Sequence, residues 1–415
     1  MAEAEERLER GTDWFRLALI VGVTVVFGLR FGLSMVAVIL ALVFMIFMHE
    51  LGHYVTAKSA GMKVTEFFIG FGPRLWSFRR GETEYGIKPI PVGAYVKIIG
   101  MSNLEEVDPE DEARTYRQQP YWRRMSVALA GSAMHFLMAF VLIFVALVFV
   151  GLPERGSERW VIGAVSDPSP ALEAGLEPGD RILEVDGQEV SEDYGAMRDY
   201  LRAQPGETVD LLVERDGEEL TISPTLADVN PQGDAVGFLG VGPESERVQR
   251  NLFEGAGEAV QVTGRTMWES VRGLVSIFSP SGISGYIDNV TNAGDAPEPG
   301  AEAVEPEDGN RFISPVGVVR LANSTWQSGA ADFLQLVFAI NIFIGLFNLV
   351  PLLPFDGGHV AIATYERVRE IGRGGRRYFA DVSKLIPLTY GVLLVLGLIF
   401  LSSLFLDIAD PLQLQ

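Results

Sequence analysis

The chain has 415 residues, of which 48% are hydrophobic, and its formal net charge is −21. It has no cysteine, which excludes disulfide bonds, thiolate metal sites and a cysteine nucleophile. Any transition metal must therefore be bound by His, Asp or Glu. We expect no nucleic-acid partner for a chain with this excess of acidic residues.

Four apolar segments are each long enough to cross a bilayer, which takes about 20 residues in a helix. These expected core spans are 31–57, 125–152, 333–359 and 385–406. Residues 1–30 contain a shorter apolar stretch, Leu17–Leu29, which is either an extra span or a helix on the membrane surface. We expect no cleavable signal there, because the following span carries the chemical motif described below. The expected fold is a polytopic α-helical membrane protein.

The charged residues are unevenly distributed along the chain. Between Leu152 and Asn310 there are 32 acidic and 10 basic residues, whereas residues 58–124 contain 11 Lys or Arg and residues 366–384 contain six. Because Lys and Arg in short loops mark the cytoplasmic side, both basic loops are expected inside and the acidic region outside. We therefore expect a multi-pass protein of the plasma membrane. In that topology, residues 49–53 and 348–359 reach a similar depth in the cytoplasmic half of the bilayer.

The acidic region begins with short strand-like runs bounded by Gly, Pro and Asp, together with a helical stretch near residues 193–203. Within it, "SPALEAGLEPGDRILEVDGQEV" resembles a PDZ domain of the kind attached to bacterial proteases, which we expect at residues 158–243. A generic β-sandwich is the alternative. Residues 244–332 then contain an amphipathic helix predicted at Asn251–Phe278, on the PDZ domain or the membrane surface, and an acidic disordered linker at 291–310.

The stretch "MIFMHELGHY", residues 45–54, puts ionisable residues at the end of an apolar run, where they are costly. In a helix, His49 and His53 lie on one face and can bind one metal ion, with Glu50 beside them. This spacing suits zinc, with the glutamate as general base that activates water. The alternative is a pair of structural histidines satisfied by backbone carbonyls.

A catalytic zinc takes three protein ligands and keeps one position open. The remaining histidines are His135 and His359, and the carboxylate at a suitable depth is Asp356 in "NLVPLLPFDGGH", residues 348–359. This segment is interrupted by Pro and Gly, and a broken helix at membrane depth is tolerated where it lines a cavity. We therefore predict Asp356 as the third ligand, with His359 as the second choice.

These motifs, in this order, resemble the site-2 protease family of intramembrane zinc metalloproteases, over essentially the whole chain from about residue 31. The resemblance implies that zinc is bound by His49, His53 and Asp356 and that water is activated by Glu50. It also suggests that Asn348 positions the substrate backbone or stabilises the oxyanion. Packing between helices is the alternative role for Asn348.

Residues 67–101 resemble the membrane-associated β-hairpin loop that follows the first core span of this family. An open strand edge there can hold an extended substrate by β-augmentation, or the aromatic and basic loop can anchor at the membrane interface.

One segment departs from the family pattern. Where the family often has "GPxxN", this chain has "AGSAMH", with Ser132 and His135. His135 is therefore either a hydrogen-bond donor near the metal and the transition state or a hydrogen-bonded core residue. His359 can orient substrate or Asp356, and a purely structural role is equally compatible with its position.

The predicted function is intramembrane zinc endopeptidase, hydrolysing a peptide bond within or near the transmembrane segment of a membrane protein. The resemblance implies a single-span substrate already shortened on its outer side, such as an anti-sigma factor or a signal-peptide remnant. The PDZ domain would filter substrates by size or bind a newly exposed carboxyl terminus. A catalytically silent membrane scaffold with a PDZ domain is the main alternative. A metal transporter is a third, although HExxH with its adjacent base is more than transport needs.

Overall fold

The structure is a computed structural model that describes residues 22, 33–166, 168–190, 194–230, 235–291 and 312–409. The stretch Leu17–Leu29 and nearly all of the linker expected at 291–310 therefore lie outside the described residues, Gly22 excepted. The chain divides into two compact units. The first comprises Met1–Val145, Ala256–Arg272 and Val318–Leu401, and the second comprises Ala146–Gly255, Gly273–Gly317 and Ser402–Gln415.

Within the described residues, four helical segments are long and apolar enough to cross a membrane. They are Val36–Ser59, Tyr121–Val150, Ala330–Phe347 and Val382–Ile408. The corresponding elements are α2 (Leu33–Ser59), α3 (Tyr121–Val145) with a π-helical turn at Ala146–Val150, α9 (Ala330–Phe347), and α11 (Ile386–Ala409) after a 3₁₀ turn at Val382–Leu385. These four candidate spans confirm the expected class, a polytopic α-helical membrane protein.

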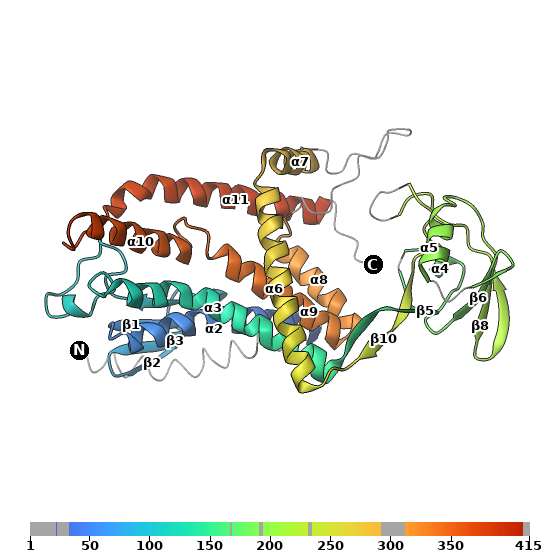
Figure 1. The fold of residues 1–415 in the computed structure, drawn as a ribbon, viewed down its shortest axis with the longest axis horizontal. Coiled ribbons are helices and arrows are strands. Elements are labelled where there is room, and N and C mark those ends of the chain that lie inside the picture. The colour runs from blue at the N-terminus through green and yellow to red at the C-terminus, as the bar shows by residue number, and fades with distance from the viewer. Residues whose placement is uncertain are drawn as a thin grey trace. The chain divides into compact units, whose positions relative to one another are not determined.

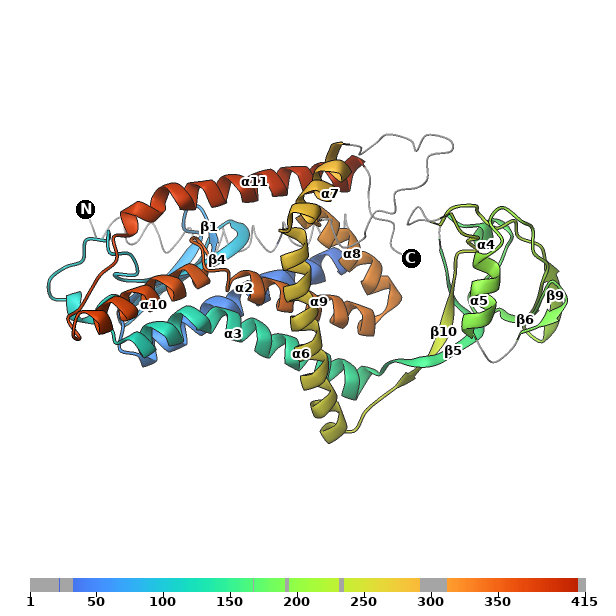
Figure 2. The same ribbon diagram turned by 45° about the horizontal axis from the view of Figure 1, so that its top comes forward.

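In the first unit, α3 is the helix that packs against α2, α9 and α10 (Asp356–Gly372) (Figures 1 and 2). Met45, Met138 and Val337 bring α2, α3 and α9 together in a buried apolar cluster. Gly52 allows α2 to approach α3 closely, because a Cβ there would lie 2.7 Å from the carbonyl oxygen of Ala130. The face of α2 that carries Gly52, His49 and His53 therefore lies at short range from α3.

The loop after α2 folds into a four-stranded sheet. Its strands are β1 (Val64–Phe71), β2 (Trp76–Arg80), β3 (Thr83–Ile87) and β4 (Ile90–Ile98), in the order β2-β3-β1-β4. The expected hairpin corresponds to β2 and β3, but β1 pairs with β3 in parallel and with β4 in antiparallel fashion. Both β1 and β4 pack on α2. The sheet is therefore fixed to the helix that carries "HELGH".

The segment expected as a basic loop, residues 366–384, is helical in its first part. Helix α10 begins at Asp356 and continues to Gly372, within the stretch expected to connect two spans. Its buried face includes Gly358, Ala363 and Glu366, which are spaced as one side of a helix. Because one of the buried residues is a glutamate, the apolar residues alone do not reveal that this segment is an amphipathic helix.

The second unit is β-rich, as expected. It contains β5 (Leu152–Val165), β6 (Arg181–Val185), β7 (Gln188–Glu189), β8 (Leu211–Arg215), β9 (Glu218–Ile222) and β10 (Val241–Val248), with α4 (Pro170–Glu173) and α5 (Tyr194–Arg202). The main sheet has the antiparallel order β10-β5-β6-β8-β9, with β7 paired to β6. Ala171 from α4 and Met197 and Leu201 from α5 complete its apolar core.

The paired strands β5 and β10 extend beyond the domain expected at 158–243. Their pairing continues to Leu152 opposite Val248. Register shifts near Pro243 interrupt the regular hydrogen bonding, but the two strands stay paired beyond them. After β10 come α6 (Leu252–Ile277), α7 (Pro280–Thr291) and α8 (Pro315–Ser328). Helix α6 lies where the sequence predicts one, and Asn251 caps it by accepting hydrogen bonds from the N–H groups of Phe253 and Glu254.

Candidate metal centre

Helix α2 presents His49 and His53 on one face, one turn apart. Both side chains are buried, and their ring centroids are 4.8 Å apart. The two Nε2 atoms lie 3.2 Å from each other. The i, i+4 spacing therefore produces the shared face that the sequence predicts for these two residues.

A break between two helices brings Asp356 to the same place. Helix α9 ends at Phe347 and α10 begins at Asp356, after a short turn in which the Leu353–Pro354 peptide bond is cis. The N–H of Gly357 donates a hydrogen bond of 2.8 Å to the carbonyl of Asn348, which closes the turn. A Cβ at Gly357 would lie 2.3 Å from the carbonyl oxygen of Leu349, so only glycine allows this close approach.

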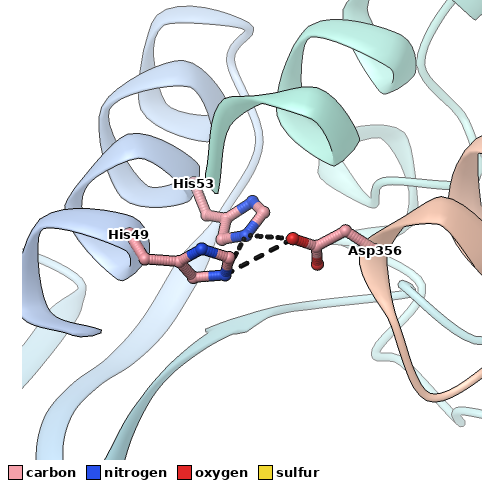
Figure 3. Close-up of side chains that lie close together, drawn as sticks. All are labelled: His49, His53 and Asp356. Atoms are coloured by element: carbon pink, nitrogen blue, oxygen red, sulfur yellow. Dashed lines mark hydrogen bonds and ion pairs between the residues drawn. The ribbon is translucent and has the colours of Figure 1, made fainter. Parts of the chain in front are cut away.

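The three side chains point toward one another (Figure 3). Asp356 Oδ2 lies 3.3 Å from His49 Nε2 and 3.2 Å from His53 Nε2. A tetrahedral zinc with bonds of about 2.0–2.1 Å separates its ligand atoms by about 3.3–3.4 Å. The triangle of donor atoms thus has nearly the size that such an ion requires, and Asp356 Oδ2 is buried without a hydrogen-bond partner among the described residues. Two nitrogens and one carboxylate oxygen fit zinc in both chemistry and spacing.

Helix α3 orients one of the histidines. His53 Nδ1 donates a hydrogen bond of 2.8 Å to the carbonyl oxygen of Val127. Because the proton is then on Nδ1, the lone pair of Nε2 is free and faces His49 and Asp356. Val127 could not have been found from the sequence, since a backbone carbonyl carries no residue-specific signal.

Gly131 of α3 lies directly against both histidine rings. A Cβ at this position would be 2.3 Å from His49 Cε1 and 2.5 Å from His53 Nε2. Any larger residue would therefore displace the rings. Gly131 belongs to the "AGSAMH" segment, and a small residue in an apolar span is a signal for close helix packing, although it does not say what packs there.

His135, one turn further along α3, lies beside the group of three. Its ring centroid is 5.1 Å from that of His49, and its Nδ1 donates a 3.0 Å hydrogen bond to Oδ1 of Asn341. The Asn341 amide in turn donates a 2.8 Å bond to the carbonyl of Val337. Asn341 was missed by sequence reasoning, although a polar residue within an apolar span was the available signal.

The other candidate residues surround this group. Glu50 is half-buried and interacts with the backbone of Val96 in β4. Asn348 is half-buried at the end of α9 and connects to the turn through its backbone carbonyl. His359 lies in the first turn of α10, with its ring 6.2 Å from that of Tyr116, and it is not one of the three residues whose donor atoms cluster. The described residues therefore place Asp356, not His359, with the two histidines.

A site with three protein ligands leaves one tetrahedral position open, as in catalytic rather than structural zinc sites. Together with a glutamate next to the first histidine, this arrangement is typical of metallopeptidases. The features on α2, α3 and α10 are thus those of a membrane protein whose side chains could form the site of a metal-dependent peptidase.

The chain belongs to peptidase family M50, whose family model matches residues 37–304 and 307–394. It is 34% identical to the zinc metalloprotease Rip1 of Mycolicibacterium smegmatis, over 93% of this chain and 100% of that protein. The zinc metalloproteases Rip1 of Mycobacterium tuberculosis and Mycobacterium bovis are each 32% identical to it, over the same shares. The resemblance to site-2 proteases and the expected enzyme class, a zinc metalloprotease of the membrane, are thereby confirmed.

Proposed function

We propose that this protein is an intramembrane zinc endopeptidase, which hydrolyses a peptide bond within or near the transmembrane segment of a membrane protein. One observation carries the proposal: the donor atoms of two histidines on an apolar helix and of one aspartate lie 3.2–3.3 Å apart. Ionisable side chains within an apolar span are costly, so their presence there favours an enzyme that acts inside the membrane over a soluble peptidase.

In this proposal His49, His53 and Asp356 bind zinc. When bound, zinc supplies a Lewis acid that makes water nucleophilic near neutral pH and polarises the scissile carbonyl. The carboxylate of Glu50 accepts a proton from the attacking water and passes it to the leaving amine nitrogen. The side-chain amide of Asn348 donates a hydrogen bond to the substrate backbone or to the developing oxyanion.

The free edge of β4 is the proposed substrate-binding strand. Among the described strands, β4 pairs only with β1, so its other edge is open, and Val96 on this strand is in contact with Glu50. A substrate must be extended before its peptide bond can be attacked. Strand addition to β4 would hold it in that form next to the proposed base.

We further propose that the basic segments 58–124 and 366–384 face the cytoplasm and that the β-rich unit lies outside as a PDZ domain. The antiparallel sheet with two short helices supports the PDZ interpretation. The proposed substrate is a single-span protein already shortened on its outer side, such as an anti-sigma factor or a signal-peptide remnant. The domain would then act as a size filter or bind the new carboxyl terminus.

The test is cleavage of a single-span reporter by purified enzyme in lipid vesicles, with the product mapped by mass spectrometry. Glu50→Gln should bind zinc as the unmodified protein does and lose cleavage by about 100-fold or more. Glu370→Gln, which changes a partly buried glutamate of α10 that pairs with Arg367, is the matched control and should retain activity. Full activity of Glu50→Gln would contradict the proposed base, and a catalytically silent scaffold would show no cleavage even without substitution. Cleavage only in the aqueous flanks of the reporter would contradict intramembrane hydrolysis.

A further inference from the structure

Helices α3 and α10 are joined by a buried ion pair. Arg124 Nη1 lies 2.6 Å from Glu366 Oε2, and the two side chains are 9% and 2% exposed. Removing two charges from water is costly, and an apolar pair of similar volume is often at least as stabilising. Stability alone is therefore a weak explanation for this pair.

Glu366 also connects two other segments to the pair. Its Oε1 accepts a 2.6 Å hydrogen bond from the N–H of Ala380, in the connection between α10 and α11. Asn103, in the loop after β4, donates bonds of 3.4 Å to Oε1 and 3.0 Å to the carbonyl of Ala380. A single carboxylate thus holds α10 against three neighbouring segments.

A chain of side-chain contacts leads from the pair to His359, three residues after Asp356. The Arg124 guanidinium lies over the ring of Tyr116, 5.1 Å from its centroid, and that ring contacts His359. His359 and Glu366 are seven residues apart and so lie on the same face of α10. The helix that carries Glu366 begins at Asp356, and the helix that carries Arg124 also carries Gly131.

We propose that the Arg124–Glu366 pair is a positioning device for the metal centre. By fixing α10 on α3, it sets the place of Asp356 relative to the two histidines that Gly131 contacts. The inference rests on the proposed assignment of Asp356 as a ligand. Neither residue touches the donor atoms, so both act through the helices that bear them.

The experiment measures the zinc affinity of the full-length protein in detergent, by competition with a chromophoric chelator. Glu366→Gln keeps an oxygen that can accept the Ala380 bond but removes the charge that pairs with Arg124. We expect it to bind zinc about 10- to 100-fold more weakly, the range found when a group that orients a metal ligand is lost. The control Glu370→Gln removes the charge that pairs with half-exposed Arg367 on the same helix, and it should bind zinc normally.

The double variant Arg124→Met/Glu366→Gln covers the case in which the single variant does not fold. It leaves no unpaired buried charge, so it should be folded, yet it should bind zinc as weakly as Glu366→Gln because both break the same pair. A purely structural pair would lower the thermal stability of the metal-free protein without changing the zinc affinity of the folded form. Unchanged zinc affinity in the folded single or double variant would overturn the inference.

Asp356→Ala, measured in parallel, distinguishes an error in the role of the ion pair from an error in the assignment of Asp356 as a ligand. If it weakens zinc binding and Glu366→Gln does not, only the role of the pair is overturned. If Asp356→Ala itself binds zinc normally, the ligand assignment is wrong and the inference falls with it.

Discussion

Gly131 and His53 are in such close contact that a single methyl group at Gly131 would lie 2.5 Å from His53 Nε2. That distance is well inside van der Waals contact, and the His53 ring cannot move freely because its Nδ1 is bonded to Val127. The geometry of the candidate metal centre therefore depends on the absence of a side chain on a neighbouring helix.

Gly131→Ala should consequently weaken zinc binding and cleavage together, each by about 10-fold or more, because overpacking of this kind costs about 1–3 kcal/mol. Zinc content after dialysis against a weak chelator and the rate of reporter cleavage measure the two effects. Gly391→Ala in α11 is the control, since a Cβ there would meet nothing within 4 Å. Equal zinc content in the two variants would show that zinc binding does not depend on the positions of the histidine rings that Gly131 contacts.

Asn341→Leu should destabilise the protein by about 1–3 kcal/mol, because it leaves the buried His135 N–H without its acceptor. Thermal unfolding of the detergent-solubilised protein checks this. The double variant His135→Phe/Asn341→Leu removes both polar groups and should recover most of the loss. Absence of any recovery would mean that His135 has an additional partner.

Glu82 should give the sheet a pH-dependent stability. Bidentate hydrogen bonds from Arg114, with a further contribution from Lys58, hold the pKa of the Glu82 carboxyl at about 2. Its pKa is lowered by folding, so its contribution is complete above the unfolded value near 4.5 and is lost as pH falls from there toward about 2.

Glu82→Gln should therefore reduce the hydrogen-exchange protection of the β2 and β3 amides at pH 7, by about 1 kcal/mol for a network open to solvent. The difference from the unmodified protein should shrink below pH 4.5, after correction for intrinsic exchange. A difference that stayed constant down to pH 3 would contradict the assigned pairing.

The proposed topology can be tested by labelling, because the chain has no native cysteine. Gly300→Cys, in the acidic segment, should react with a membrane-impermeant maleimide in intact cells. Arg376→Cys, in the basic segment after α10, should react only after lysis. The opposite pattern would invert the model of the membrane orientation.

The length of the apolar segments was enough to predict the membrane spans, and helical spacing was enough to predict the shared face of His49 and His53, because both depend on residues close in sequence. The importance of Gly131 and Val127 could not be predicted, since it depends on which helix packs against α2. The same holds for the four-stranded sheet: β4 passes β3 and pairs with β1, and the local sequence of residues 67–101 does not encode that choice of partner. Arg124 and Glu366 lie far apart in sequence, and nothing local marks them as a pair.

The face of α3 that carries Arg124, Val127, Gly131 and His135 has a consequence for the lipid environment. All four positions meet other segments of the first unit through one rigid span. Helix tilt is one of the ways in which a span adapts to a bilayer of different hydrocarbon thickness. If α3 tilts relative to its neighbours, these four contacts would change together, because they lie on one helix.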